Sequence, residues 1–218
     1  MEALGVKILH EPREMASSIE RVGIGFLFAP AIHASMKHVQ PVRKELKLRT
    51  VFNLLGPLTN PAAAAVQLVG APSERAAELM ANALAQLGLA RGFVVHGSDG
   101  MDEITTTGPS VAFHVDWGRV TKRTVEPSDF GVPVAKLEDL RGGSPAENRE
   151  IALRILDGET GPRRDIVLVN ASAALVAMGV AGHFKDGVAQ AARSIDSGGA
   201  RGRLDGLVRF TNGAYHEI

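Results

Sequence analysis

The segment VQLVGAPSERAAELMANALAQLGLARGFVVHG, residues 66–97, decides the fold class of this chain. Val66–Gly70 is a short apolar run that ends in glycine, as a strand does, and Phe93–Gly97 is nearly all apolar, as is typical of a parallel strand buried on both faces. Between them, Ser73 is a suitable N-cap for a helix over Glu74–Leu87. A strand, a helix and a strand within about thirty residues form a βαβ unit. The segment therefore predicts an α/β fold with a central, mostly parallel sheet flanked by helices.

The loop that follows the second predicted strand reads GSDGMDE, residues 97–103. Ligands of parallel sheets bind beyond the carboxyl ends of the strands, so this loop is a candidate binding site. Its adjacent carboxylates, Asp102 and Glu103, are oxygen ligands of the kind that Mg²⁺ prefers, and Mg²⁺ often bridges to a substrate phosphate. The alternative is an acidic turn that is simply solvated. We therefore expect either a Mg²⁺ site or a solvated turn at this position.

The stretch before the βαβ unit, Arg49–Pro61, reads RTVFNLLGPLTNP. Its glycine and two prolines fix the backbone and remove amide donors, so the loop holds one shape and can present carbonyls and an apolar surface to a ligand. A rigid connection between a helix and a strand is the alternative. Arg43 and Arg49 flank the stretch, and guanidinium groups suit anions. His33 is either a structural histidine or a hydrogen-bonding partner of a substrate.

The rest of the chain predicts helices, one antiparallel hairpin and no internal repeat. Residues 1–5 look like the last turn of a helix with Gly5 as its C-cap. In the first part of the chain we expect a helix from Pro12 to Gly23, a strand or buried turn at 25–30, and a helix over His33–Leu46 interrupted at Pro41. We expect the strands of the hairpin at 111–115 and 119–125. Three further helices are expected: one from an N-cap at Ser144 to near Gly158, one over Arg164–Met178 and one over Phe184–Ser194. The tail, 198–218, is expected to form one more turn or a short helix before fraying.

The composition narrows the class of protein. The net charge is +0 and the pI is about 7.1, which gives no general attraction to nucleic acid or to an acidic membrane. The chain has no cysteine, which excludes disulfides and thiolate chemistry and fits a reducing compartment. The N-terminus lacks the order of a signal peptide, and no apolar run approaches the ~20 residues of a membrane span. We expect a soluble, cytoplasmic, globular protein.

Several motifs together closely resemble the anthranilate phosphoribosyltransferase family. They are Phe28-Ala29-Pro30, His33, Pro41-Val42-Arg43, RTVFNLLGPLTNP and Gly100-Met101-Asp102-Glu103-Ile104. The resemblance runs over nearly the whole chain and implies the nucleoside phosphorylase and phosphoribosyltransferase type of catalytic domain. It also implies a reaction of tryptophan biosynthesis, in which the amine of anthranilate displaces diphosphate from phosphoribosyl diphosphate with the help of Mg²⁺.

The resemblance implies roles for particular residues. By motif, Asp102 and Glu103 match the acidic pair that binds Mg²⁺, and Arg43 matches the arginine that pairs with the carboxylate of anthranilate. The loop that lines the aromatic ring and the substrate entry side are matched by Gly56, Pro57, Ala29, Pro30 and His33. No side chain is assigned as a catalytic residue, because catalysis is expected to come from positioning and from the metal ion.

The chain also departs from the family pattern. The family's N-terminal helical domain, which forms its homodimer, and its phosphate-binding loops do not occur in these 218 residues. We expect residues 1–218 to be a single but partial α/β catalytic domain, with weak or no turnover alone and with its oligomeric state open. A non-catalytic binding or remnant domain of the same fold is one alternative, and a nucleoside phosphorylase relative is another.

Overall fold

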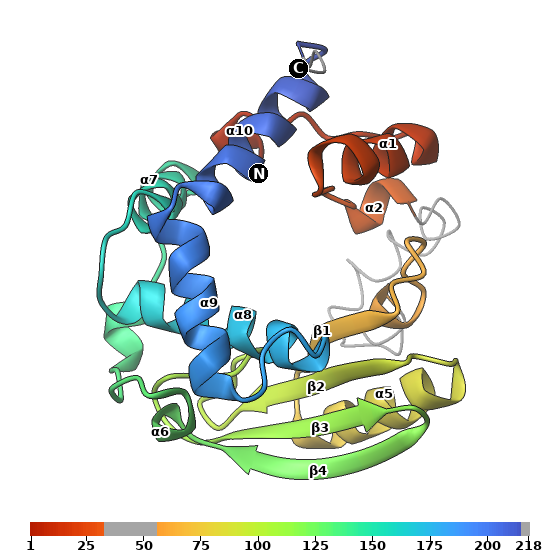
Figure 1. Cartoon of the computed structure of the whole chain (residues 1–218), viewed down its shortest axis with the longest axis vertical. Coiled ribbons are helices and arrows are strands. Elements are labelled where there is room, and N and C mark those ends of the chain that lie inside the picture. The colour runs from red at the N-terminus through yellow and green to blue at the C-terminus, as the bar shows by residue number, and fades with distance from the viewer. Residues whose placement is uncertain (33–55, 215–218) are drawn as a thin grey trace, which may run out of the picture.

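The computed structural model describes residues 1–32 and 56–214, which contain a four-stranded sheet flanked by helices (Figure 1). The strand order is β1-β2-β3-β4, with bounds Val66–Gly70, Arg91–Gly97, Ser110–Asp116 and Arg119–Val125. β1 and β2 pair in parallel, and β2-β3 and β3-β4 pair antiparallel. The α/β class and the flanking helices are confirmed, but the described sheet is mixed where a mostly parallel one was expected. The connection between β2 and β3 contains no helix, and a parallel return requires a long crossover, usually helical.

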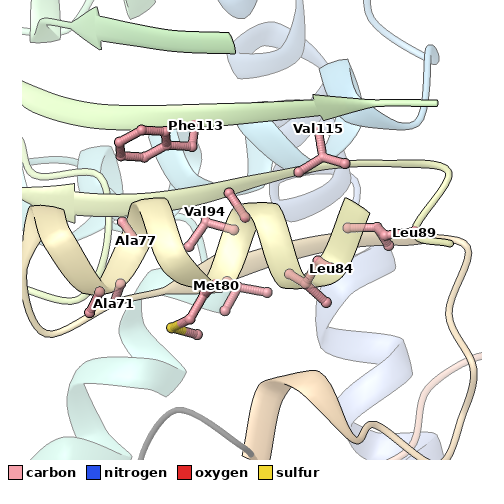
Figure 2. Close-up of a cluster of buried hydrophobic side chains, with 11 residues drawn as sticks. Ala71, Ala77, Met80, Leu84, Leu89, Val94, Phe113 and Val115 are labelled. Atoms are coloured by element: carbon pink, nitrogen blue, oxygen red, sulfur yellow. The ribbon is translucent and has the colours of Figure 1, made fainter. Parts of the chain in front are cut away.

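The expected βαβ unit is confirmed in β1, α5 (Glu74–Gln86) and β2. Ser73 caps α5, since its Oγ accepts a hydrogen bond of 3.2 Å from the amide of Ala76. α5 covers one face of the sheet, and Met80 and Leu84 belong to one buried apolar cluster with Val94 and Phe113 of the strands (Figure 2). Two leucines of this segment, Leu79 and Leu87, are exposed.

The opposite face of the sheet is covered by α8 (Pro162–Ala177) and α9 (Phe184–Asp196). β2 alternates between the two layers, because Val94 packs with α5 while Phe93 and Val95 pack with α8. Both helices begin and end within two residues of the expected bounds. β2 is buried on both faces, as its apolar sequence predicts.

The hairpin of β3 and β4 turns through Trp117 and Gly118, both with positive φ angles, 45° and 84°. A two-residue turn of this kind matches the right-handed twist of the strands it joins, so the predicted hairpin is confirmed. β4 lies at an edge of the described sheet, and it carries the exposed side chains of Arg119, Lys122 and Arg123. Charges on an edge strand discourage pairing with another chain.

The C-terminal helix α10 (Gly199–Thr211) is longer than the single turn or short helix that was expected. Its glycines lower its intrinsic helix propensity, but Leu207 is buried against Val6 and Val22 near the N-terminus. Asn212 also donates a hydrogen bond of 2.9 Å to the carbonyl of Gly5. Tertiary contacts with a distant part of the sequence therefore stabilise this helix, and Figure 1 shows it beside α1 at the end of the molecule away from the sheet.

The remaining elements follow the expected capping signals. α7 begins at a capping box in which Ser144 and Glu147 each accept a hydrogen bond from the other's backbone amide. Gly5 and Gly23 end their helices in the left-handed conformation. The bounds are Glu2–Leu4 for η1, Pro12–Val22 for α1, Ala29–Ile32 for α2, Pro127–Phe130 for α6, Leu137–Leu140 for η3 and Pro145–Leu156 for α7. The helix expected over His33–Leu46 lies outside the described residues. Within the described ranges, no helix has the length and apolarity needed to cross a bilayer.

Candidate functional site

The loop between β2 and β3 folds over the carboxyl ends of β1 and β2. The amide of Gly97 donates a hydrogen bond of 2.9 Å to the carbonyl of Met101, which closes the loop on itself. Gly70, the last residue of β1, lies so close to Asp102 that a Cβ atom there would be 1.7 Å from the Asp102 carbonyl oxygen. Only glycine permits this approach, and it places the acidic pair directly beside the end of β1.

Asp99 organises the first half of this loop. Its Oδ2 accepts hydrogen bonds from the hydroxyls of Thr105, at 2.5 Å, and Thr107, at 2.8 Å. Its Oδ1 accepts one from the amide of Met101, at 3.1 Å. Burial alone would raise the pKa of Asp99, but these hydrogen bonds outweigh it, so the pKa lies below its ordinary value of 3.8. Asp99 is therefore a charged residue whose hydrogen bonds stabilise the loop, and its carboxylate is not free to bind a ligand.

Asp102 and Glu103 are exposed at the tip of the same loop. Partial desolvation raises the pKa of the Glu103 carboxyl above its ordinary value of 4.5, and the negative charges of Asp102 and Asp99 raise it further. A cation bound here would relieve this repulsion. No group of three or more acidic or histidine side chains gathers to hold a metal ion in the part of the chain that the structure describes. A metal ion at this pair would therefore need further oxygen ligands from water or from a substrate.

Asn170 of α8 holds the second half of the loop. Its Oδ1 accepts a hydrogen bond of 3.0 Å from the amide of Ile104, and its Nδ2 donates one of 2.9 Å to the carbonyl of Ile104. The same Nδ2 donates to the carbonyl of Ile166, at 3.0 Å, and lies 3.5 Å from Oε2 of Glu103. Ile104 is buried beside Val169 in the layer between α8 and the sheet.

A cleft of about 310 Å³ lies next to this loop, at the end of β1. This volume is at the lower end of the range of small-molecule pockets. Three of the residues expected to contact an aromatic substrate, Ala29, Gly56 and Pro57, line it together with Gly70. The other lining residues are Leu27, Ile32, Asn60, Pro61, Gln67, Leu68 and Val69. Gly70 therefore lines the cleft together with part of the expected apolar wall and also lies against the backbone of Asp102.

The structure does not describe the side chains of the other expected substrate contacts. His33 and Arg43 lie outside the described residues, as does the side chain of Pro30. His96 has its Nδ1 within 2.9 Å of the carbonyl of Ala71, a contact that ties the end of β2 to the chain after β1.

Sequence reasoning missed Asn170 and the role of Asp99. Asn170 is a polar side chain within an apolar, alanine-rich helix, and a polar group withdrawn from water in this way requires hydrogen-bond partners. The polar side chain in an apolar helix was therefore a signal that Asn170 has hydrogen-bond partners, although it does not identify those partners. Asp99 lies between glycines, beside the more conspicuous acidic pair. Its partners Thr105 and Thr107 follow within eight residues of it.

Comparison with known proteins identifies the family of the chain. The model of the glycosyl transferase family, a/b domain, matches residues 1–201. The chain belongs to this family. Among its relatives, the glycosyl transferase chain is 61% identical over 210 residues to an anthranilate phosphoribosyltransferase of Solibacter usitatus (strain Ellin6076). That match covers 96% of this chain and 62% of the relative, so the chain spans less than two thirds of its relative's length.

Solved structures of the same enzyme share the fold of this glycosyl transferase chain. The anthranilate phosphoribosyltransferase of Thermus thermophilus has a TM-score of 0.88 and 44% identity, covering 97% of this chain and 63% of that one. The enzyme of Saccharomyces cerevisiae in complex with PRPP and Mg has a TM-score of 0.86 and 29% identity, covering 97% and 61%. The yeast enzyme in complex with 4-fluoroanthranilate has a TM-score of 0.78 and 27% identity, covering 97% and 67%.

Proposed function

We propose that this protein acts in the transfer of a phosphoribosyl group from phosphoribosyl diphosphate to anthranilate, in tryptophan biosynthesis. One observation carries the proposal: the apolar cleft at Gly56 and Pro57 adjoins the end of β1, where Gly70 touches the backbone of Asp102. An aromatic acceptor and a metal-bound diphosphate need to meet in this way. The relatives and the solved structures named above support the same reaction.

In this reaction, the lone pair of the anthranilate nitrogen forms the new bond to C1 of the ribose. The C1–oxygen bond breaks, and its electron pair leaves on diphosphate, while the nitrogen loses a proton to water. The products are N-(5-phosphoribosyl)anthranilate and diphosphate. We assign no catalytic side chain, because the transition state is dissociative and the protein contributes by holding the two reactants in place.

Within this proposal, Ala29, Gly56 and Pro57 form the wall against which the aromatic ring lies, and all three line the cleft. A flat ring suits an apolar and rigid surface. Pro30 and His33 are assigned to the entry side of the same substrate on the basis of their motif. Arg43 is assigned to the carboxylate of anthranilate, since a guanidinium pairs with a carboxylate through two parallel hydrogen bonds.

Asp102 and Glu103 are the residues that would hold Mg²⁺. Their donor atoms are carboxylate oxygens, they are exposed on one loop, and their mutual repulsion, which contributes to the raised pKa of Glu103, favours a bound cation. When bound, Mg²⁺ supplies positive charge that stabilises the departing diphosphate. The role of the two side chains is to fix that charge beside the end of β1.

The partners in this proposal are the two small-molecule substrates, with no nucleic acid and no membrane. We assign residues 1–218 to one α/β catalytic domain and leave the oligomeric state open. A cytoplasmic location is part of the proposal, and the cysteine-free composition supports it.

The test is the binding of anthranilate to the 218-residue chain, followed by the ligand's own fluorescence. Gly56 has open space where a side chain would start, so Gly56→Leu fills the cleft without a backbone clash. The matched control is Gly202→Leu, at another glycine with open space, on the exposed side of α10. We expect saturable binding that Gly56→Leu weakens by about tenfold or more, as the loss of a complementary pocket implies, and that Gly202→Leu leaves unchanged.

Three outcomes would contradict the proposal. Equal binding by the wild-type chain and Gly56→Leu would place anthranilate outside the cleft. Binding of thymidine or uridine in place of anthranilate would instead favour a nucleoside phosphorylase relative, and a chain that binds neither class of ligand would favour a remnant domain.

A further inference from the structure

Asn170 lies on the face of α8 that meets the acidic loop. Its neighbour in sequence, Val169, is fully buried in the same apolar layer as Ile104. The end of the loop is therefore packed onto α8 through Ile104, and Asn170 stands beside this contact. Asn170 and Ile104 are 66 positions apart in the sequence, so the contact joins two distant parts of the chain.

The two shortest links from Asn170 to the loop both go to the backbone of Ile104. Asn170 accepts one hydrogen bond from the amide of Ile104, at 3.0 Å, and donates the other to the carbonyl of Ile104, at 2.9 Å. The amide of Ile104 belongs to the same planar peptide unit as the Cα atom of Glu103. Fixing that amide therefore fixes the point from which the Glu103 side chain starts.

The carboxylate of Glu103 itself stays available. Nδ2 of Asn170 carries two hydrogens, but it faces three acceptors, namely the carbonyls of Ile104 and Ile166 and Oε2 of Glu103. The contact with Glu103 is the longest of the three, at 3.5 Å, whereas the two carbonyls lie 2.9 and 3.0 Å from Nδ2. Asn170 thus holds the backbone of the ligand residue without occupying its carboxylate.

The Asp102 end of the acidic pair is held by contacts other than those of Asn170. Met101 is held by Asp99 through its amide and by Gly97 through its carbonyl, and Asp102 rests on Gly70. The Asp102 end is thus held against β1, whereas the Glu103 end is held against α8. The position of α8 and the position of Glu103 are therefore coupled through the hydrogen bonds of Asn170 and the packing of Ile104 on α8.

We propose that Asn170 is a positioning residue, which sets the place of the Glu103 carboxylate for a divalent cation. This inference rests on the proposed function, because it takes Asp102 and Glu103 as the residues that hold the metal. A neutral amide suits the role, since it provides a donor and an acceptor to the same backbone unit and adds no charge beside Glu103. Outer partners of this kind, when removed, lower metal affinity by about 10- to 100-fold in proteins.

The experiment measures the affinity of the 218-residue chain for Mn²⁺, used as a probe of the divalent site, by water-proton relaxation. The variants are Asn170→Ala and Glu103→Gln. The matched control is Ser172→Ala on the same helix, because Ser172 is fully buried and donates one hydrogen bond, of 2.7 Å, to the carbonyl of Phe184 rather than to the loop. Unfolding of each variant by denaturant is recorded alongside.

We expect Asn170→Ala to weaken Mn²⁺ binding by about tenfold and Ser172→Ala to leave it unchanged at a similar loss of stability. Glu103→Gln should weaken binding more than either. If Asn170→Ala does not fold, Asn170→Ser keeps a hydroxyl at the position and is expected to show the same direction with a smaller change.

The outcomes separate the two proposals. If Glu103→Gln weakens Mn²⁺ binding but a folded Asn170 variant binds as the wild type does, the positioning role is overturned and the metal site stands. If Glu103→Gln binds Mn²⁺ like the wild type, the assignment of the metal site fails, and the positioning role fails with it.

Discussion

Gly70→Ala is the substitution that most sharply probes how β1 meets the acidic loop. The added Cβ atom would lie 1.7 Å from the carbonyl oxygen of Asp102, 2.7 Å from its carbonyl carbon and 3.2 Å from its Cβ atom. Real Cβ contacts essentially never fall below 3.0 Å, so the oxygen and the new atom must separate by more than an ångström. The neighbouring backbone is anchored on both sides, at Met101 by Gly97 and at Ile104 by Asn170.

Because neither side of the contact is the flexible end of a side chain, the strain cannot relax locally. Overpacking of this kind costs about 1–3 kcal/mol, and we expect the upper end, about 3 kcal/mol. The usual benefit of replacing a strand glycine by alanine, about 0.5–1 kcal/mol, is too small to offset it. Gly70→Ala should therefore lower the free energy of unfolding by about 2–3 kcal/mol and displace Asp102.

Two measurements check this prediction, namely denaturant unfolding and Mn²⁺ affinity. Gly202→Ala is the control, since it lies within α10 with nothing within 4 Å of the new atom, and it should stabilise the protein by up to about 1 kcal/mol. A Gly70→Ala protein with the stability and the Mn²⁺ affinity of the wild type would refute the reasoning, because it would mean that β1 does not touch the acidic loop.

Two further predictions concern the hydrogen bonds of Asp99 and the packing of α8 against α9. Asp99→Asn should lower the free energy of unfolding by about 2 kcal/mol, because Thr105 and Thr107 lose a charged acceptor. Since the pKa of Asp99 is lowered in the folded state, its stabilisation is fully present above the ordinary value of 3.8 and is lost as the pH falls through the folded-state value. Unfolding curves of the wild type and Asp99→Asn should accordingly converge on acidification, and a gap that widened instead would contradict this sign. Gly187→Ala should cost about 2 kcal/mol in denaturant unfolding, because the new Cβ atom would lie 2.9 Å from Cα of Ser172 and separate α8 from α9. An unchanged midpoint would show that these helices are not in such close contact.

Local sequence patterns predicted the elements that depend on local physics. β1 and β4 have the expected bounds, and the capping signals at Ser73 and Ser144 mark where α5 and α7 begin. These signals act within a few residues, so the sequence displays them directly. The turn at Trp117 and Gly118 was expected for the same reason.

Features that depend on distant partners were predicted less well. α10 is weakly helical by composition and forms because Leu207 meets Val6 and Val22, more than a hundred residues away. The mixed pairing of the sheet depends on how the connection before β3 folds, which its strand sequence does not show. Tertiary packing overrides local propensity in both cases.

The candidate site shows the same division. The rule that ligands bind at the carboxyl ends of strands led to Asp102 and Glu103, and the resemblance to a known family added Gly56 and Pro57. The hydrogen bonds of Asn170 to the loop were missed, because nothing in a helix sequence tells which loop one of its polar side chains will meet. Contacts between distant residues require the folded structure.

The central claim is that an aromatic acceptor and a divalent cation bind side by side, in the cleft and at Glu103. The most direct test is the ¹⁹F resonance of 4-fluoroanthranilate, a ligand that the yeast relative binds, recorded with the chain while Mn²⁺ is added. Mn²⁺ broadens only nuclei that lie near it. We expect broadening of the bound resonance in the wild type and little in Glu103→Gln at the same Mn²⁺ concentration, after subtraction of the broadening that Mn²⁺ causes in the ligand without the protein. A bound resonance that stays sharp in the wild type while Mn²⁺ occupies its site would contradict the claim.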